Sequence, residues 1–195
     1  MEYRHCFPVL VLLLACGCST PAVQETAPPT TAVAITLDEL VIPEKLDSLE
    51  LLAQSASDNQ RNVIYRSSLD NLPSLQVSIY PLPDGWELWD VERQLLGHYG
   101  QVRLAVLNQL ATKGDNFSHI RAEQEPDFTQ KIPVAALQAR SALANSVLTE
   151  NHLLALYQGY YFKARYDAEA NDSPLALEEA QLLLRHLIEQ LLPKP

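Results

Sequence analysis

Cysteine is scarce in this chain and confined to one end of it. The 195 residues include three cysteines, Cys6, Cys16 and Cys18, all within the first 18 positions. The rest of the chain therefore cannot form an internal disulfide. It also offers no cysteine nucleophile and no thiolate ligand for a metal ion.

Motifs for catalysis and nucleotide binding are missing as well. The sequence has no glycine-rich phosphate loop, no Gly-x-Ser-x-Gly elbow, no His-Glu-x-x-His zinc motif and no EF-hand loop. We therefore expect no cofactor, and a noncatalytic role is favoured over an enzyme.

Positive charge is in short supply. Fourteen lysines and arginines stand against 24 aspartates and glutamates, which gives a formal net charge of -10. Nonspecific binding to nucleic acid or to an anionic membrane surface depends on a cationic protein surface. The composition therefore argues against nucleic acid as a partner and favours a soluble acidic domain.

Long apolar runs are limited to residues 7–15, which follow Arg4. This run is too short to cross a bilayer, which takes about 20 apolar residues, and it is typical of a cleavable signal peptide. Leu13-Leu14-Ala15-Cys16 at its end resembles a bacterial lipobox. The resemblance implies cleavage before Cys16 and attachment of diacylglycerol and an acyl chain such as palmitate to that residue. Cys18, preceded by Gly17, is the alternative lipidation site, and an ordinary secretory signal is a further alternative.

Such an anchor holds the protein on a membrane. Its chains bury several tens of methylenes, each contributing about 0.8 kcal/mol. Gly17 after Cys16, or Ser19 after Cys18, resembles the outer-membrane sorting class of lipoproteins. We expect a lipid-anchored protein on the periplasmic face of the bacterial outer membrane, with an envelope protein as its possible partner.

The chain divides by composition into three parts. Residues 1–15 form the signal peptide, and residues 16–36 form the lipid anchor with a tether rich in proline and threonine. Residues 37–195 are long enough for one domain with a real core and too short for two ordinary domains.

Two hairpins are indicated within that domain. Residues 62–69 and 75–80 are rich in β-branched and aromatic side chains, and the second segment alternates apolar and polar positions. Residues 151–157 and 160–167 form a second strand pair with Gly159 at the turn, because the latter segment alternates clearly.

Helices and the remaining strands complete the pattern. Apolar residues recur every three or four positions over residues 86–111, which predicts one long helix, and Ser173-Pro174 begins a C-terminal helix that ends near residue 192. Residues 116–123 and 134–148 are each interpreted as a strand. The sequence thus predicts an α+β fold, an antiparallel sheet packed by a long central helix and a C-terminal helix in a sandwich.

This order of elements, with Lys163 and Arg165 in the strand before the final helix, is loosely similar to the PsbP and Mog1-like fold. The resemblance implies the sandwich architecture and assigns no function.

Two groups of polar residues are candidate sites. The first, a possible divalent-metal or acid-base cluster, is close in sequence, although a solvated loop is the plainer interpretation; it comprises His119, Glu123, Glu125 and Asp127. The second is a basic patch on one sheet face, which requires the strand registers to align; it comprises Arg66, Arg121, Arg140, Lys163 and Arg165. Cross-strand pairing of these cations with aspartate and glutamate is the alternative.

Two functions follow from these observations. The favoured hypothesis is a membrane-anchored envelope lipoprotein that acts as a noncatalytic binding or scaffold module. The alternative is a small periplasmic hydrolase or metal-dependent enzyme that uses the region from His119 to Asp127.

Overall fold

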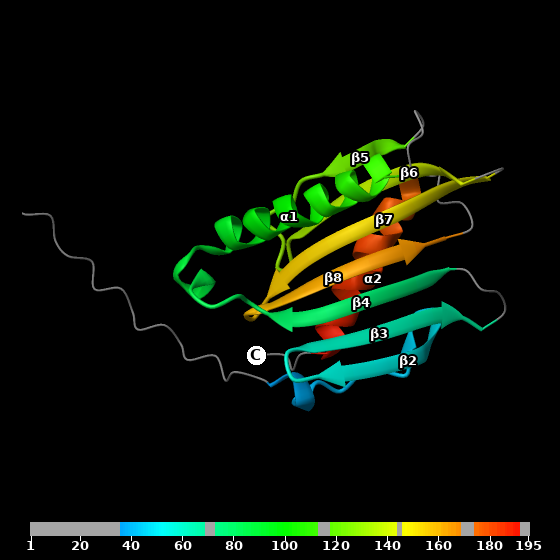
Figure 1. Cartoon of the computed structure of the whole chain (residues 1–195). Coiled ribbons are helices and arrows are strands. Elements are labelled where there is room, and N and C mark those ends of the chain that lie inside the picture. Colours follow the sequence, from blue (N-terminus) through cyan, green and yellow to red (C-terminus); the bar gives the residue numbers. More distant parts are fainter. Residues whose placement is uncertain (1–35, 69–72, 113–117, 144–145, 169–173, 192–195) are drawn as a thin grey trace, which may run out of the picture. The chain divides into compact units, whose positions relative to one another are not determined.

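The computed structural model describes residues 36–68, 73–112, 118–143, 146–168 and 174–191 (Figure 1). The predicted signal peptide, both candidate lipidation sites and nearly all of the predicted tether lie outside these residues. The described part is an eight-stranded antiparallel sheet with α1 (Val91–Thr112) on one face and α2 (Pro174–Leu191) on the other. The predicted α+β class and the placement of both helices are confirmed.

Two hairpins meet at the centre of the sheet. The strand order is β1-β2-β3-β4-β8-β7-β6-β5, so β8 pairs with β4 on one side and β7 on the other. The strands are β1 (Lys45–Leu46), β2 (Leu49–Ser57), β3 (Gln60–Ser67), β4 (Ser74–Pro81), β5 (His119–Gln124), β6 (Val134–Leu143), β7 (Ser146–Tyr157) and β8 (Tyr160–Asp167).

The turn between β7 and β8 explains why that hairpin is readable in the sequence. Gln158 and Gly159 both have positive φ angles, 50° and 82°. Two-residue hairpin turns of this kind match the right-handed twist of the strands and favour glycine. Local chemistry therefore fixes the register of β7 on β8, including the predicted alternation of side chains along β8.

The face under α2 is apolar along almost the whole sheet. Leu75, Val77 and Ile79 of β4 point to this side together with Phe162 and Tyr166 of β8, as the alternation predicts. Leucines along α2 close the same cluster, which also reaches Leu46 and Leu49.

The face under α1 is apolar over part of the sheet only. Buried side chains of α1, among them Leu95, Tyr99 and Val102, pack on β6, β7 and Tyr161 of β8. Figure 1 shows α1 lying across the β5–β7 side and leaving β2, β3 and β4 uncovered on this face. Neither α1 nor α2, the long helices of the described part, is apolar enough along its length to span a membrane.

The structure corrects the predicted start of the long helix. Residues 86–88 form a short 3-10 turn, and α1 begins only at Val91. Asp90 caps it, because its side chain accepts a hydrogen bond from the Arg93 amide at 2.7 Å and its carbonyl accepts one from Gln94. Apolar residues recur at helical spacing on both sides of Asp90, so this periodicity does not show where α1 begins.

Two strand assignments also change. Residues 134–148, predicted as one strand, are β6 and the beginning of β7, since Leu143 pairs with Ser146 across a hairpin. No glycine or proline marks this turn in the sequence. The β1–β2 region was not predicted as strand at all: Leu49–Ser57 has no β-branched residue, and pairing with β3 overrides its weak local preference.

Candidate functional site

The uncovered part of the sheet on the α1 side carries a polar surface, which we call the open face. It is built from side chains that alternate with the core residues of β3, β4 and β8: Asn62, Ile64, Arg66, Gln76, Ser78, Lys163 and Arg165. Because β4 and β8 are neighbours, these residues from two separate hairpins form one surface.

Lys163 lies near the middle of the open face. The register aligns Lys163 with Ser78 on β4, and Ser78 in turn with Asn62 on β3. Ser78 donates its hydroxyl to Asn62 Oδ1 at 2.7 Å, and Gln60 donates its amide to the same oxygen at 2.6 Å. Lys163 is exposed, and within the described residues no carboxylate oxygen lies within 4.0 Å of its Nζ.

Next to Lys163 on β8, Arg165 is held between two carboxylates. Its Nη2 lies 3.0 Å from Glu150 Oε1, and its Nε lies 3.2 Å from Asp167 Oδ2. The side chain of Glu150 is only 5% exposed. Arg165 is therefore paired with carboxylates, which is the alternative to a free basic patch.

His152 lies beside this ion-pair group. Its Nε2 is 3.9 Å from Glu150 Oε2, and its side chain is 12% exposed. Burial, together with the positive charges of Arg165 and Lys163, lowers the pKa of His152 to about 4. The imidazole is consequently neutral at pH 7, so it adds no positive charge to the open face.

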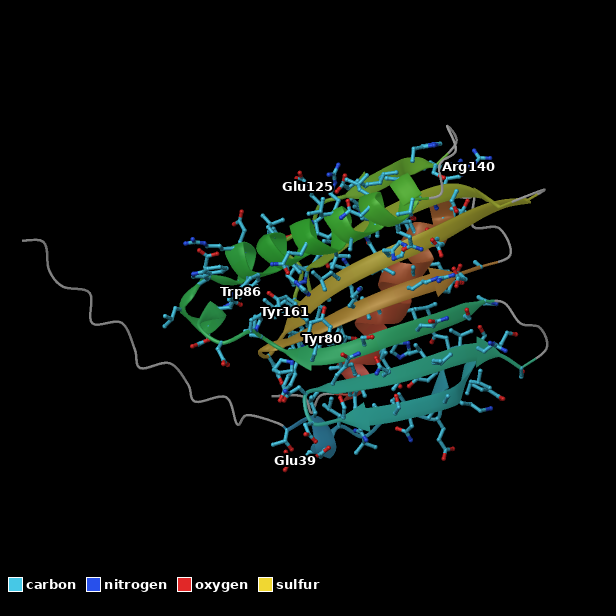
Figure 2. All side chains as sticks on the ribbon, viewed as in Figure 1. Glu39, Tyr80, Trp86, Glu125, Arg140 and Tyr161 are labelled. Atoms are coloured by element: carbon cyan, nitrogen blue, oxygen red, sulfur yellow. The ribbon has the colours of Figure 1, made fainter. Side chains whose placement is uncertain are left out.

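An aromatic group closes one end of the open face. Tyr80 donates its hydroxyl to His98 Nε2 at 2.6 Å, because His98 Nδ1–H is directed at Gln101 Oε1, 3.1 Å away. Tyr161 packs against His98 with ring centroids 4.3 Å apart and the ring planes tilted by 45°. Trp86 contacts both rings edge-on. Figure 2 shows Tyr80, Trp86 and Tyr161 together at this end.

The electrostatics of this aromatic group keep it uncharged. Burial lowers the pKa of His98, and the nearby charge of Lys163 lowers it further, while the Gln101 contact opposes both effects. Burial also raises the pKa of Tyr80 to about 12. Lys163 is therefore a positive charge that acts on a neutral aromatic group.

The predicted basic patch divides over the molecule. Arg66, Lys163 and Arg165 share the open face, as predicted. Arg140 is on the α2 side of the sheet, because its neighbour Ala139 belongs to the cluster under α1, and Figure 2 shows it far from Tyr80. Arg121 lies at a register shift in the edge strand β5.

The predicted metal or acid-base cluster is also dispersed. His119 on β5 is the cross-strand register partner of Arg140 on β6. Glu123 accepts hydrogen bonds from the side chains of Tyr99 and Arg103, each at 2.9 Å. Asp127 accepts bonds from the amide and hydroxyl of Thr129 in its own turn. In the described ranges no three His, Cys, Asp or Glu side chains are placed to hold a metal ion. The positions of these residues therefore give no support to the hydrolase hypothesis, and nothing in the structure adds support through Glu125.

Several residues of the open face were not singled out from sequence. Asn62, Gln76 and Ser78 occupy the polar positions of two alternating strands, which is the signal that places them opposite the core. The sequence did not indicate that β4 pairs with β8, and this pairing brings them to Lys163.

No family model matches the chain, and no curated protein matches it. It is similar to the solution structure of cyanobacterial PsbP (CyanoP) from Synechocystis sp. PCC 6803, with 12% identity, a TM-score of 0.41, and coverage of 75% of this chain and 92% of that chain. This neighbour is of the PsbP type that the order of elements resembles. An identity and a TM-score this low establish no shared function.

Proposed function

We propose that this chain is a lipid-anchored envelope lipoprotein whose folded domain is a noncatalytic binding module, with the open face as its binding surface. The lipobox-like Leu13-Leu14-Ala15-Cys16 supports the anchor. The observation that carries the binding surface is the uneven cover of the sheet: α2 closes one face, whereas α1 leaves the β3–β4–β8 part of the other face exposed.

The composition of the open face suits reversible binding. It presents amide, hydroxyl and charged groups that water solvates in the free protein, so its exposure costs little stability. The aromatic group at its end adds partly buried Trp86 and Tyr80, and aromatic side chains of this kind contribute strongly to protein interfaces. A protein partner would thus contact polar side chains beside a group of aromatic rings.

The anchor is tested by labelling cells with radioactive palmitate. We expect label on the wild-type chain and on Cys18→Ala, and none on Cys16→Ala, which would remain in the soluble periplasmic fraction. Label that persists in Cys16→Ala and disappears in Cys18→Ala would move the lipid to Cys18. A wild-type chain without label would leave an ordinary secretory signal.

The binding surface is tested by photo-crosslinking in intact cells with the full, anchored chain. A photoreactive amino acid at Gln76, on the open face, is expected to capture a protein partner. The matched position is Leu182 on α2, which is 65% exposed and lies on the opposite side of the sheet. Capture from Leu182 and not from Gln76 would contradict the proposed surface.

A further inference from the structure

We infer that Lys163 and Asn62 form a seat for a single carboxylate presented by the protein partner, an inference that rests on the open face being the binding surface. Lys163 provides the charge and Asn62 provides amide donors. The partner is thereby specified as one that places an aspartate, a glutamate or its C-terminus on the centre of this surface.

Lys163 differs from the other charged residues around it. Arg165 is compensated by Glu150 and Asp167, and Arg66 also has a partner. Lys163 lies on the central strand of the sheet, is exposed, and has no ion-pair partner within the described part of the chain. A lysine with that placement leaves one positive charge for a ligand.

Asn62 supplies the hydrogen-bond donors of this seat. Asn62 Oδ1 accepts from both Gln60 and Ser78, so its amide nitrogen retains its two N–H groups for other contacts. Asn62 and Lys163 flank Ser78 across neighbouring strands, about 10 Å apart along the row at the usual strand spacing. The short Asn62 side chain already contacts the Ser78 hydroxyl, and the long Lys163 side chain is able to extend over the same serine, where a carboxylate would meet one cation and one amide.

The charges around Lys163 favour one class of anion. Glu150 and Asp167 lie in adjacent positions of β7 and β8 and would repel a doubly charged phosphate more than a carboxylate. The net charge of -10 also opposes approach to an anionic membrane.

The experiment uses the Gln76 crosslink to the partner in intact cells. Lys163→Glu places like charges together and is expected to reduce the crosslinked fraction at least tenfold, equal to about 1.4 kcal/mol. Lys163→Arg keeps the charge and retains most of the crosslink. Lys131→Glu, at an exposed position on the β5–β6 connection, makes the same change in net charge and leaves the yield unaltered.

The outcomes separate this inference from the proposed function. Crosslinking that survives Lys163→Glu overturns the carboxylate seat and retains the binding surface. A wild-type chain that yields no crosslink from Gln76 overturns both. Lys163→Gln, which removes the charge without reversing it, repeats the test if the glutamate variant fails to accumulate, and it is expected to lose part of the yield.

A second measurement identifies the anion. The lipidated full chain in detergent micelles is titrated with an amidated, acetylated pentapeptide that contains one glutamate, and backbone amide shifts are followed by NMR. We expect Ser78 and Lys163 to shift, and the glutamine counterpart of the peptide to have no effect. Larger shifts with inorganic phosphate or with phosphatidylglycerol bicelles would overturn the assignment to a protein carboxylate.

Discussion

The sheet face under α2 is apolar across the strands from β1 to β6, whereas the face under α1 is apolar only on the β5–β8 side. Neighbouring residues of β8 show the contrast directly. Phe162 is fully buried against α2, and Lys163 faces solvent on the other side. Two successive residues of one strand thus lie on a face that packs against a helix and on a face that contacts solvent.

The contrast extends to polar groups on the α1 side. Where α1 covers the sheet, the buried Tyr161 hydroxyl has a protein partner, since it donates to the Gln94 carbonyl at 2.8 Å. Beyond the edge of α1, charged side chains appear, because only there does water solvate them. The position of α1 therefore sets the boundary between the packed part of this face and the open face, the proposed binding surface.

The largest expected effect tests the fully covered face. Phe162→Ala removes a buried ring between the sheet and α2 and is expected to lower the free energy of unfolding by about 3–5 kcal/mol in urea denaturation. Leu182→Ala, at an exposed position of α2, should change it by less than about 0.5 kcal/mol. Equal effects at the two positions would remove the distinction between core and surface on this side.

The ion pair at the border of the open face gives the next effect. Glu150→Gln leaves Arg165 with Asp167 alone and is expected to cost about 2–3 kcal/mol, because the Glu150 side chain is nearly buried. The matched variant is Glu50→Gln, whose partner Lys45 lies 3.3 Å away in an exposed pair. That change should cost less than about 0.5 kcal/mol. A similar loss in both variants would mean that burial does not strengthen the Glu150 pair.

The pH dependence of stability tests His152, the nearly buried imidazole beside Glu150. The pKa of His152 is about 4 in the folded chain and about 6.5 in the unfolded chain, so the unfolded chain binds more protons between these values. Stability should therefore fall as pH decreases through this window, with His152 contributing about 2 kcal/mol between pH 7 and pH 5. In His152→Gln this part of the slope disappears, and an unchanged slope would argue against a buried neutral imidazole.

The smallest expected effect is the loss of a buried hydrogen bond under α1. Tyr161→Phe removes the hydroxyl that bonds to the Gln94 carbonyl and should lower the free energy of unfolding by about 1–2 kcal/mol. Tyr157→Phe serves as the control, because within the described residues its hydroxyl has no hydrogen-bond partner, and it should cost less than about 0.5 kcal/mol. Equal stability of the two variants would show that the buried hydrogen bond contributes nothing net.

Local patterns in the sequence were sufficient for much of the fold. Alternation along β4 and β8 identified the core-facing residues, and Gly159 marked the turn between β7 and β8. Apolar periodicity identified both helices. These features depend on contacts between residues near one another in the chain, which is why they are recoverable without a structure.

The predictions that failed depend on distant contacts or on chemistry that periodicity does not record. The β1–β2 hairpin exists because β2 pairs with β3, and the break between β6 and β7 has no glycine or proline to mark it. The start of α1 follows from the Asp90 cap. Of the five residues in the predicted basic patch, only three share the open face, because the parity of each strand decides the side on which a residue lies.

The sequence by itself determined the α+β class, the faces of the alternating strands and the features that indicate a lipid anchor, because each is encoded in composition or short-range periodicity. Tertiary structure alone decided that β4 lies beside β8, which places Lys163 next to Ser78 and Asn62. It also decided how far α1 covers the sheet. Both outcomes arise from packing between segments that are far apart in the chain, and no local pattern specifies which segments will meet.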